Sequence, residues 1–157
     1  MKTILVPIDF SDVAGDIIET VKKIATAFAS RVILLHVRQT DPLIGNIAEE
    51  QISMTPSAYL PTPPVMVHVE PTAQAQQRLD WFCQRFAGLP VEVTSRQCAG
   101  NPEEMILKVC EEEDADMIVI GSHGHGALYN LLVGSVTEGV LKDAKCPLLV
   151  IPSPRAR

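Results

Sequence analysis

The chain has 157 residues, a formal net charge of −6 and a pI near 5.1. This length suits one domain with a substantial core, and 46% of the residues are apolar, mostly Val, Ile, Leu and Ala with few aromatic side chains, as buried parallel sheets require. The negative charge argues against a broad nucleic-acid-binding or anionic-membrane surface, although a local phosphate site is compatible with it.

Four cysteines are scattered along the chain without a C-x-x-C pair: Cys83, Cys98, Cys110 and Cys146. We therefore predict reduced thiols rather than a metal site, with at least three of them on buried elements. No apolar run reaches the length of a membrane span, and the sequence starts with a strand pattern rather than a signal sequence. We expect a soluble, cytoplasmic protein with no membrane partner.

The first 37 residues predict a right-handed β-α-β unit. The β-branched run 3–8 predicts a strand, with Pro7 near its end because proline removes a ladder donor. Ser11 is expected to cap the following helix, which runs to about residue 29. The run 31–37 predicts a second strand that is buried on both faces. One stripe of the helix should face the core, formed by Val13, Ile17, Val21, Ile24 and Phe28.

Regular patterning stops after residue 38 and resumes at about residue 72. This stretch holds Pro42, Pro56, Pro61, Pro63, Pro64 and Pro71. Roughly thirty residues without regular structure is long for a compact domain, so we predict a Pro-rich loop insertion at about 39–72 that acts as a lid, a binding loop or a mobile insertion. Residues 65–69 within it are a candidate for a short edge strand.

The next elements are a helix, an edge strand and a second helix. The helix covers residues 73–86, with Trp81 outside its apolar stripe of Leu79, Phe82 and Phe86. Residues 91–95 alternate, which predicts a strand at a sheet edge with one wet face. Asn101 and Pro102 then begin a helix as its N-cap and first residue. Its core-facing side chains are expected to be Met105, Ile106, Val109 and Cys110.

The stretch 121–135 reads G-S-H-G-H-G-A-L-Y-N-L-L-V-G-S and follows an apolar run over 116–120, the fourth core strand. Ser135 and Glu138 have the spacing of a capping box, which predicts Ser135 as the N-cap of a helix that ends near residue 142. A strand end, a glycine loop and a helix N-terminus expose backbone N–H groups, and such a site suits a phosphate. A last strand covers 147–152.

Strands that alternate with helices predict an α/β fold: a single Rossmann-like, doubly wound, five-stranded parallel sheet with helices on both faces. Ligands of such sheets bind beyond the carboxyl ends of the strands, where the strand order reverses. Asp9, Val37 and Gly121 should converge there, and Gly100 and Pro102 could line the cleft.

The glycine loop matches neither the Walker A pattern nor G-x-G-x-x-G, and no acidic residue stands where a ribose partner is expected. General rules therefore leave two interpretations open: a phosphate-binding loop, or a loop whose glycines only make tight turns.

The spacing of Gly121, Gly124, Gly134 and Ser135 resembles the ATP-binding signature of the universal stress protein family, G-2x-G-9x-G-[ST]. Four further landmarks resemble the family in the same order: I-L-V-P-I-D-F-S at 4–11, L-L-H-V at 34–37, G-N-P at 100–102 and C-P-L-L-V-I-P at 146–152. The resemblance covers the chain from end to end apart from the 39–72 insertion. The chain is thus identified as a single universal-stress-protein-like domain over 1–157.

The resemblance implies a strand order of 3-2-1-4-5 and an ATP site, to which Mg²⁺ could be added with the phosphates. It implies that Asp9 and Val37 flank the adenine with Pro7 beside them. It further implies that the ribose and phosphates follow Ile120, Gly121, Ser122, His123, Gly124 and His125. The β- and γ-phosphates would be held by Gly134, Ser135 and Val136.

Several of these residues have a competing structural role. Ser135 could serve only its own helix, and Asp9 could cap the first helix alongside Ser11. His123 and His125 are expected to be tolerated loop residues rather than catalytic or metal-binding ones, and His36 a hydrogen-bonded core histidine. We predict no catalytic and no metal-binding residue.

The implied function is that of an ATP-dependent switch or holder in the stress response rather than a dedicated enzyme, because no general base and no Walker-type lysine accompany the γ-phosphate. Slow hydrolysis or autophosphorylation stays open. The alternative is a nucleotide-independent, dimeric interaction protein, and the weakest reading is an enzyme acting on a small phosphorylated substrate. The family also implies a homodimer through antiparallel pairing of the edge strand 147–151.

Overall fold

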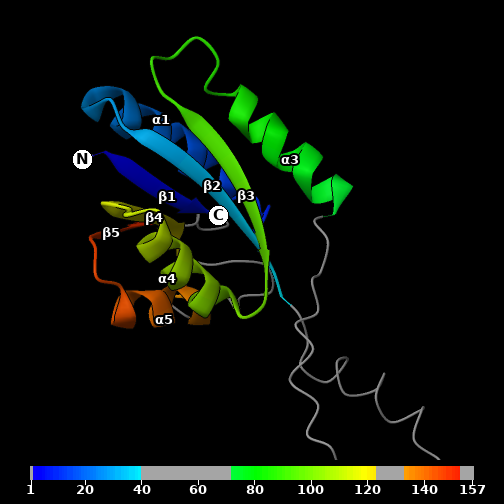
Figure 1. Cartoon of the computed structure of the whole chain (residues 1–157), viewed down its shortest axis with the longest axis vertical. Helices are drawn as coiled ribbons and strands as arrows, with labels where there is room; N and C mark the ends of the chain where they lie inside the picture. The colour runs from blue at the N-terminus through cyan, green and yellow to red at the C-terminus, as the bar shows by residue number, and fades with distance from the viewer. Residues whose placement is uncertain (1, 40–71, 123–132, 153–157) are drawn as a thin grey trace, which may run out of the picture.

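The computed structural model describes residues 2–39, 72–122 and 133–152, which form one five-stranded parallel sheet with helices on both faces (Figure 1). The strand order is β3-β2-β1-β4-β5, as the resemblance implied. In chain order the elements are β1 (Thr3–Pro7), α1 (Ala14–Phe28), β2 (Arg31–Arg38), α3 (Ala73–Gln84), β3 (Val93–Ala99), α4 (Pro102–Glu112), β4 (Met117–Gly121), α5 (Ser135–Asp143) and β5 (Leu148–Ile151).

Each face of the sheet has its own hydrophobic core because successive strand side chains point to opposite faces. Ile4 and Val6 of β1 pack with α1 and α3, whereas Leu5 between them packs with α4 and α5. Figure 1 shows α4 and α5 together on one side of the sheet and α3 on the other. The central strands are buried on both faces, as their continuous apolar runs predicted. No helix in the described ranges is long and apolar enough to cross a membrane.

The edge strand β3 is longer and starts later than predicted. It spans Val93–Ala99 rather than 91–95, because its pairing with β2 continues from Val32↔Val93 to Arg38↔Ala99. β3 does lie at a sheet edge, as its alternation indicated. The predicted insertion at 39–72 and the candidate strand at 65–69 fall almost wholly outside the described residues.

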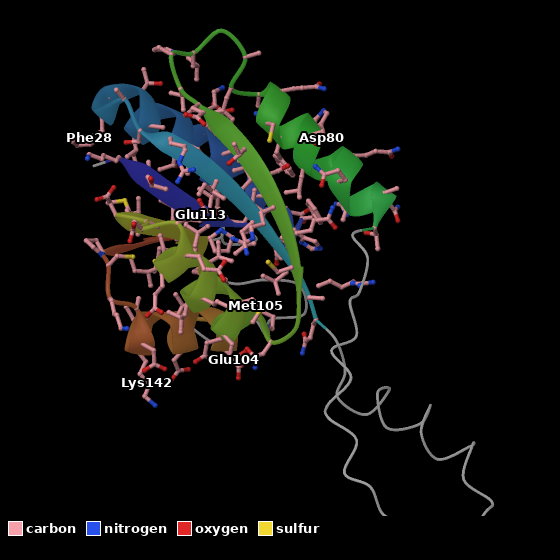
Figure 2. The ribbon with its side chains drawn as sticks, viewed as in Figure 1. Phe28, Asp80, Glu104, Met105, Glu113 and Lys142 are labelled. Carbon is pink, nitrogen blue, oxygen red and sulfur yellow. The ribbon has the colours of Figure 1, made fainter. Side chains whose placement is uncertain are left out.

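The first helix begins and ends differently from the prediction. Ser11 is not its N-cap: the cap is Val13, and the Ser11 carbonyl rather than its hydroxyl accepts the Ala14 N–H (3.0 Å). Phe28 is 60% exposed, not inward (Figure 2). Phe28 is the last residue of α1, directly before the left-handed Ala29 that ends the helix, and its side chain faces solvent.

The predictions for α3 and α4 are largely confirmed. Leu79, Phe82 and Phe86 are buried, and Trp81 is 55% exposed. Asn101 caps α4, with its Oδ1 accepting from the Glu104 N–H at 3.3 Å. Ile106, Val109 and Cys110 face the core, while Met105 is only half-buried. All four cysteines are free, but the expectation that three would be buried is wrong, because only Cys110 is.

Candidate functional site

The candidate site lies at the carboxyl edge of the sheet, beyond β1, β2 and β4. The chain passes from β1 to β2 and β3 on one side and then crosses to β4 on the other side of β1. The strand order therefore reverses between β1 and β4. Segments that follow these two strands diverge to opposite faces and leave room for a ligand at this point.

Asp9 and Val37 lie near the carboxyl ends of β1 and β2. β1 and β2 pair in the register Thr3↔Arg31 to Pro7↔Leu35, and the Ile8 N–H donates to the Leu35 carbonyl at 2.7 Å. Asp9 and Val37 each come two residues after the last pair of this ladder, Pro7↔Leu35. Asp9 is exposed, and its Oδ1 accepts the Ser11 N–H at 3.0 Å. Both residues predicted to flank the adenine therefore belong to this end of the sheet.

Pro7 and Ile120 lie near the carboxyl ends of β1 and β4. These strands pair through Ile4↔Met117 and Leu5↔Ile118, and Pro7 and Ile120 each come two residues after the last pair. Ile120 is buried and Pro7 half-buried. Both residues therefore lie mostly beneath the surface at this end of the sheet.

The turn after β1 has a strained backbone that side chains hold in place. Phe10 has a φ of 63°, in the left-handed region that non-glycine residues seldom adopt. Its ring packs at a tilt of 35° against His36, with centroids 4.3 Å apart, and the Arg78 guanidinium lies 4.3 Å from the ring centre. Arg78 Nη2 also donates to the Phe10 carbonyl at 3.2 Å. These contacts fix the turn that carries Asp9.

His36 is a half-buried strand residue with a hydrogen-bond partner, as expected. Its Nδ1–H donates to the Ile8 carbonyl at 2.9 Å. The imidazole thus links the ends of β1 and β2 and supports the Phe10 ring. It has a positioning role in this part of the chain.

The end of β3 is tied to the end of β2 by Gly100. The Gly100 N–H donates to the Arg38 carbonyl at 3.0 Å, and its φ of 138° favours glycine. A Cβ at this position would lie 3.4 Å from the Met105 side chain. This tie sets the start of α4 beside the strand ends.

The first turn of α5 is fastened to the end of β4 by two hydrogen bonds. The Thr137 hydroxyl donates to the Gly121 carbonyl at 2.8 Å, and the Gly134 N–H donates to the Ser122 carbonyl at 2.7 Å. Thr137 and Ser122 are buried, and the Ser122 N–H donates to the Ile151 carbonyl at 2.8 Å. The helix N-terminus is therefore held at the edge of the sheet with little freedom to move.

Gly134, not Ser135, is the N-cap of α5, so the predicted capping box with Glu138 is wrong. Gly134 has the extended backbone of a cap, and Ser135 is the exposed first helical residue. No side chain in the described ranges caps this helix. A helix N-terminus of this kind presents its first N–H groups and the positive end of its dipole, which favour an anion. Because Ser135 is not the N-cap, its hydroxyl is not engaged in capping this helix.

His123, Gly124 and His125 lie outside the described residues, so the middle of the predicted glycine loop has no structural account. The flanking members, Gly121 and Ser122 before it and Gly134 after it, are at the edge. Among the described residues no three His, Cys, Asp or Glu side chains group as metal ligands.

A surface hollow of about 420 Å³ lies on the outer face of α3 and is lined by Gln74, Gln77, Arg78, Trp81 and Phe82. It adjoins the Phe10 turn through Arg78, but none of its lining side chains is a carboxylate or a histidine. It offers no acid–base or metal chemistry, and we do not assign the site to it.

Sequence reasoning missed the residues that support the site. Thr137 stood inside the mis-assigned capping box, and its hydroxyl was available to the strand because position 137 is on the buried side of α5. Arg78 and Phe10 are 68 residues apart, so no local pattern connects them. The one signal available in the sequence was the position of Thr137, two residues after the final Gly-Ser of the motif, which places its hydroxyl in the first turn of the helix.

Comparison with known proteins places this geometry in a family. The model of the Universal stress protein family matches residues 1–152. Universal stress protein MJ0577 of Methanocaldococcus jannaschii is 33% identical over 161 residues, covering 96% of this chain and 94% of that protein. A universal stress protein of Thermus aquaticus is 28% identical over 150 residues, covering 96% and 98%.

Solved structures have the same fold. The structure of MJ0577 has a TM-score of 0.76 at 30% identity and covers 99% of this chain and 98% of that one. An Archaeoglobus fulgidus universal stress protein in complex with dAMP has a TM-score of 0.62 at 20% identity, with 96% and 98% covered. A universal stress protein in complex with cAMP has a TM-score of 0.60 at 18% identity, with 96% and 95% covered. At these two lower identities the likeness shows the fold alone.

Proposed function

The chain belongs to the universal stress protein family, and from its site geometry we propose that it binds ATP at the carboxyl edge of the sheet and works as a nucleotide-dependent switch. In this proposal Asp9 and Val37 flank the adenine, with Pro7 beside them. The phosphates lie at the start of α5, on Gly134, Ser135 and Val136. The motif residues His123, Gly124 and His125 border the ribose and phosphates together with Ile120, Gly121 and Ser122.

The observation that carries the proposal is the N-terminus of α5. Thr137 and Ser122 hold it against the end of β4, and its cap is a glycine without a side chain. Orphan N–H groups and the positive end of the helix dipole favour a phosphate here. Ser135 is exposed, and its hydroxyl can donate to a phosphate oxygen. The complexes of family members with dAMP and cAMP support an adenine nucleotide as the ligand.

The same site is suited to holding a nucleotide rather than turning it over quickly. The motif contains no Walker-type lysine to neutralise the phosphates. A Mg²⁺ ion that accompanies the nucleotide would be bound largely by the phosphates and by water, as is usual for this ion. We propose hydrolysis or autophosphorylation that is slow at most.

The test is direct detection of the nucleotide together with one charge substitution. Purified protein is denatured, and the supernatant is analysed by ion exchange for adenine nucleotides; the melting temperature is then measured with and without added ATP. Ligand at about 100 times its Kd stabilises the folded state by about 2.7 kcal/mol, which a melting curve resolves. We expect released adenine nucleotide and a rise in melting temperature.

Ser135→Glu places a carboxylate at the first position of α5, where it favours the helix but repels phosphate. We expect this variant to fold and to lose both signals. Ala73→Glu is the matched control, since Ala73 is the exposed first residue of α3. The proposal is wrong if the purified protein releases no adenine nucleotide and its melting temperature does not respond to ATP. It is also wrong if Ser135→Glu and Ala73→Glu lose these two signals to the same extent.

A second function, interaction through dimers, is favoured by the free edge of β5. β5 pairs with β4 only and is the outermost strand of the described sheet. Its four residues are apolar and half-buried, an edge that invites pairing with another strand. We propose an antiparallel homodimer through residues 147–151, which can operate with or without nucleotide.

A further inference from the structure

Two cysteines that are 36 residues apart in the sequence meet on the α4 side of the sheet. Cys110 lies in the last turns of α4, and Cys146 lies just before β5. Their Sγ atoms are 3.3 Å apart. We propose that Cys110 and Cys146 form a redox-active dithiol, which a hydroperoxide such as hydrogen peroxide converts to an intramolecular disulfide. This proposal is independent of nucleotide binding.

The approach needed to form the bond is small. A disulfide has an S–S distance of about 2.05 Å, so the two sulfur atoms must approach by only about 1.3 Å. Cys110 is fixed by the packing of α4, next to Ile106 and Val109 in the core. Cys146 lies between α5 and β5, where the backbone belongs to neither helix nor strand and can adjust. The geometry therefore permits the bond without a change in the fold.

The two thiols differ in exposure, which gives them different roles. Cys110 is buried and Cys146 is half-buried, so a peroxide reaches Cys146 first. The Cys146 thiol gives up its proton, and the thiolate attacks one peroxide oxygen. The O–O bond breaks, a sulfenic acid forms, and the leaving hydroxide takes up that proton to give one water. The Cys110 sulfur then attacks the sulfenic sulfur, the S–S bond forms, and a second water leaves with the Cys110 proton. In sum the two thiols lose two protons and two electrons, and the peroxide is reduced to two waters.

The surroundings of Cys110 suit a resolving thiol. Burial raises the pKa of the Cys110 thiol to about 12, helped by the hydrogen bond to Cys146 and by the charge of Cys146. Cys110 therefore stays protonated and unreactive while Cys146 meets the oxidant.

The bond would enclose a functionally important part of the chain. The closed loop from residue 110 to residue 146 contains β4, the 121–135 stretch and α5. Oxidation would thus tie the end of α4 to the start of the β5 edge strand. A cross-link that closes a loop of this length stabilises the folded state by restricting the unfolded chain.

The experiment uses the full-length chain and a Cys83→Ser/Cys98→Ser variant, which keeps only the proposed pair. Each protein is treated with stoichiometric hydrogen peroxide, unfolded in an alkylating reagent, digested without reductant and analysed by mass spectrometry. We expect a linked Cys110–Cys146 peptide in both proteins, loss of the two thiols together, and recovery of both after dithiothreitol. The oxidised protein should also melt at a higher temperature than the reduced one.

Cys110→Ser provides the second arm, because it removes the resolving thiol and leaves Cys146 as a sulfenic acid that dimedone traps. The double variant keeps the test decisive if Cys110→Ser fails to fold. The proposal is overturned if Cys110 remains alkylatable while Cys146 is oxidised, or if Cys146 forms a disulfide between two chains. Equal oxidation of Cys83 or Cys98 in the full-length chain would also overturn it, since it would show no preference for the pair.

Discussion

Phe10 keeps the turn after β1 in a conformation that costs free energy, of the order of 1 kcal/mol or more for a residue outside glycine. Arg78 compensates for this cost twice, by its hydrogen bond to the Phe10 carbonyl and by its position over the ring. The neighbouring Asp9 is proposed to contact the adenine. Side chains that never touch the nucleotide can therefore set its affinity.

Arg78→Met tests this arrangement. The substitution keeps the stem of the side chain but removes the guanidinium, so we expect the free energy of unfolding to fall by about 1 kcal/mol, as for an exposed cation–π contact with a hydrogen bond. ATP affinity should fall by up to about fivefold, because Asp9 is less well positioned. Chemical unfolding and titration calorimetry measure the two effects. Gln77→Met, on the exposed side of the same helix, should change neither.

Asp116 shows how one carboxylate can join two strands. Its Oδ2 accepts the backbone N–H groups of Thr3 (2.8 Å) and Lys2 (2.6 Å), and these hydrogen bonds lower the pKa of Asp116 below its usual 3.8. A lowered folded-state pKa means that the stabilisation is complete above pH 3.8 and is lost as the pH falls through the folded-state value.

We therefore expect Asp116→Asn to be less stable than the parent protein at neutral pH. The difference should shrink as the pH is lowered below 3.8. Urea unfolding of both proteins across this range measures it. A difference that stays constant down to the acid limit would show that the charge of Asp116 does not carry the effect.

At the scale of elements, the attachment of α5 to β4 decides where the proposed phosphate site lies. Thr137→Val keeps the size of the side chain and removes its hydroxyl, leaving the buried Gly121 carbonyl without that donor. We expect a loss of about 1–3 kcal/mol in the free energy of unfolding and weaker ATP binding, measured by urea unfolding and calorimetry.

Thr20→Val is the matched control for that substitution. The Thr20 hydroxyl also donates to a carbonyl, that of Asp16 at 2.9 Å, but the bond is exposed and lies within α1. Water replaces it, so a change within about 0.5 kcal/mol is expected. If Thr137→Val and Thr20→Val lower the free energy of unfolding equally, the hydrogen bond from Thr137 to Gly121 does not contribute more than an exposed one.

The helix ends also explain which sequence predictions failed. Asn101 caps α4 as predicted, because its own backbone is extended, its side chain accepts the Glu104 N–H, and Pro102 follows at the first helical position. Ser11 and Ser135 have the residue type of a cap, but tertiary contacts override the local pattern. Ser11 enters its helix from the left-handed Phe10, and its Oγ is buried with no hydrogen-bond partner in the part of the chain that the structure describes. At α5, the Gly134–Ser122 hydrogen bond makes Gly134 the cap.

At the scale of the whole molecule, the alternation of strand and helix patterns along the sequence predicted five strands in a parallel sheet. It also predicted the edge of the sheet at which a ligand would lie. The strand order came from the family resemblance and is confirmed. The strand ends after which Asp9 and Val37 were expected, those of β1 and β2, are neighbours in the sheet and pair as far as Pro7↔Leu35. The contacts of Arg78 with Phe10 and of Cys110 with Cys146 depend on how helices pack on the sheet, and no local period encodes such pairs.

The proposed dimer depends on which backbone groups β5 leaves open. The Ile118 N–H donates to the Pro147 carbonyl and the Ser122 N–H to the Ile151 carbonyl, so residues 147, 149 and 151 direct their backbone groups to β4. Because these directions alternate along a strand, Leu148 and Val150 direct theirs to the free edge. Two copies could therefore pair through Leu148 and Val150 without disturbing either sheet.

Val150→Pro removes one outward N–H while leaving the bonds to β4 in place. We expect the parent protein to be a dimer by light scattering at micromolar concentration and the variant to shift to monomer. Circular dichroism and ATP binding should stay close to those of the parent, since the sheet and the α5 N-terminus are not altered. A parent protein that is monomeric at every concentration, or a variant that stays fully dimeric while folded, would place the partner surface elsewhere than β5.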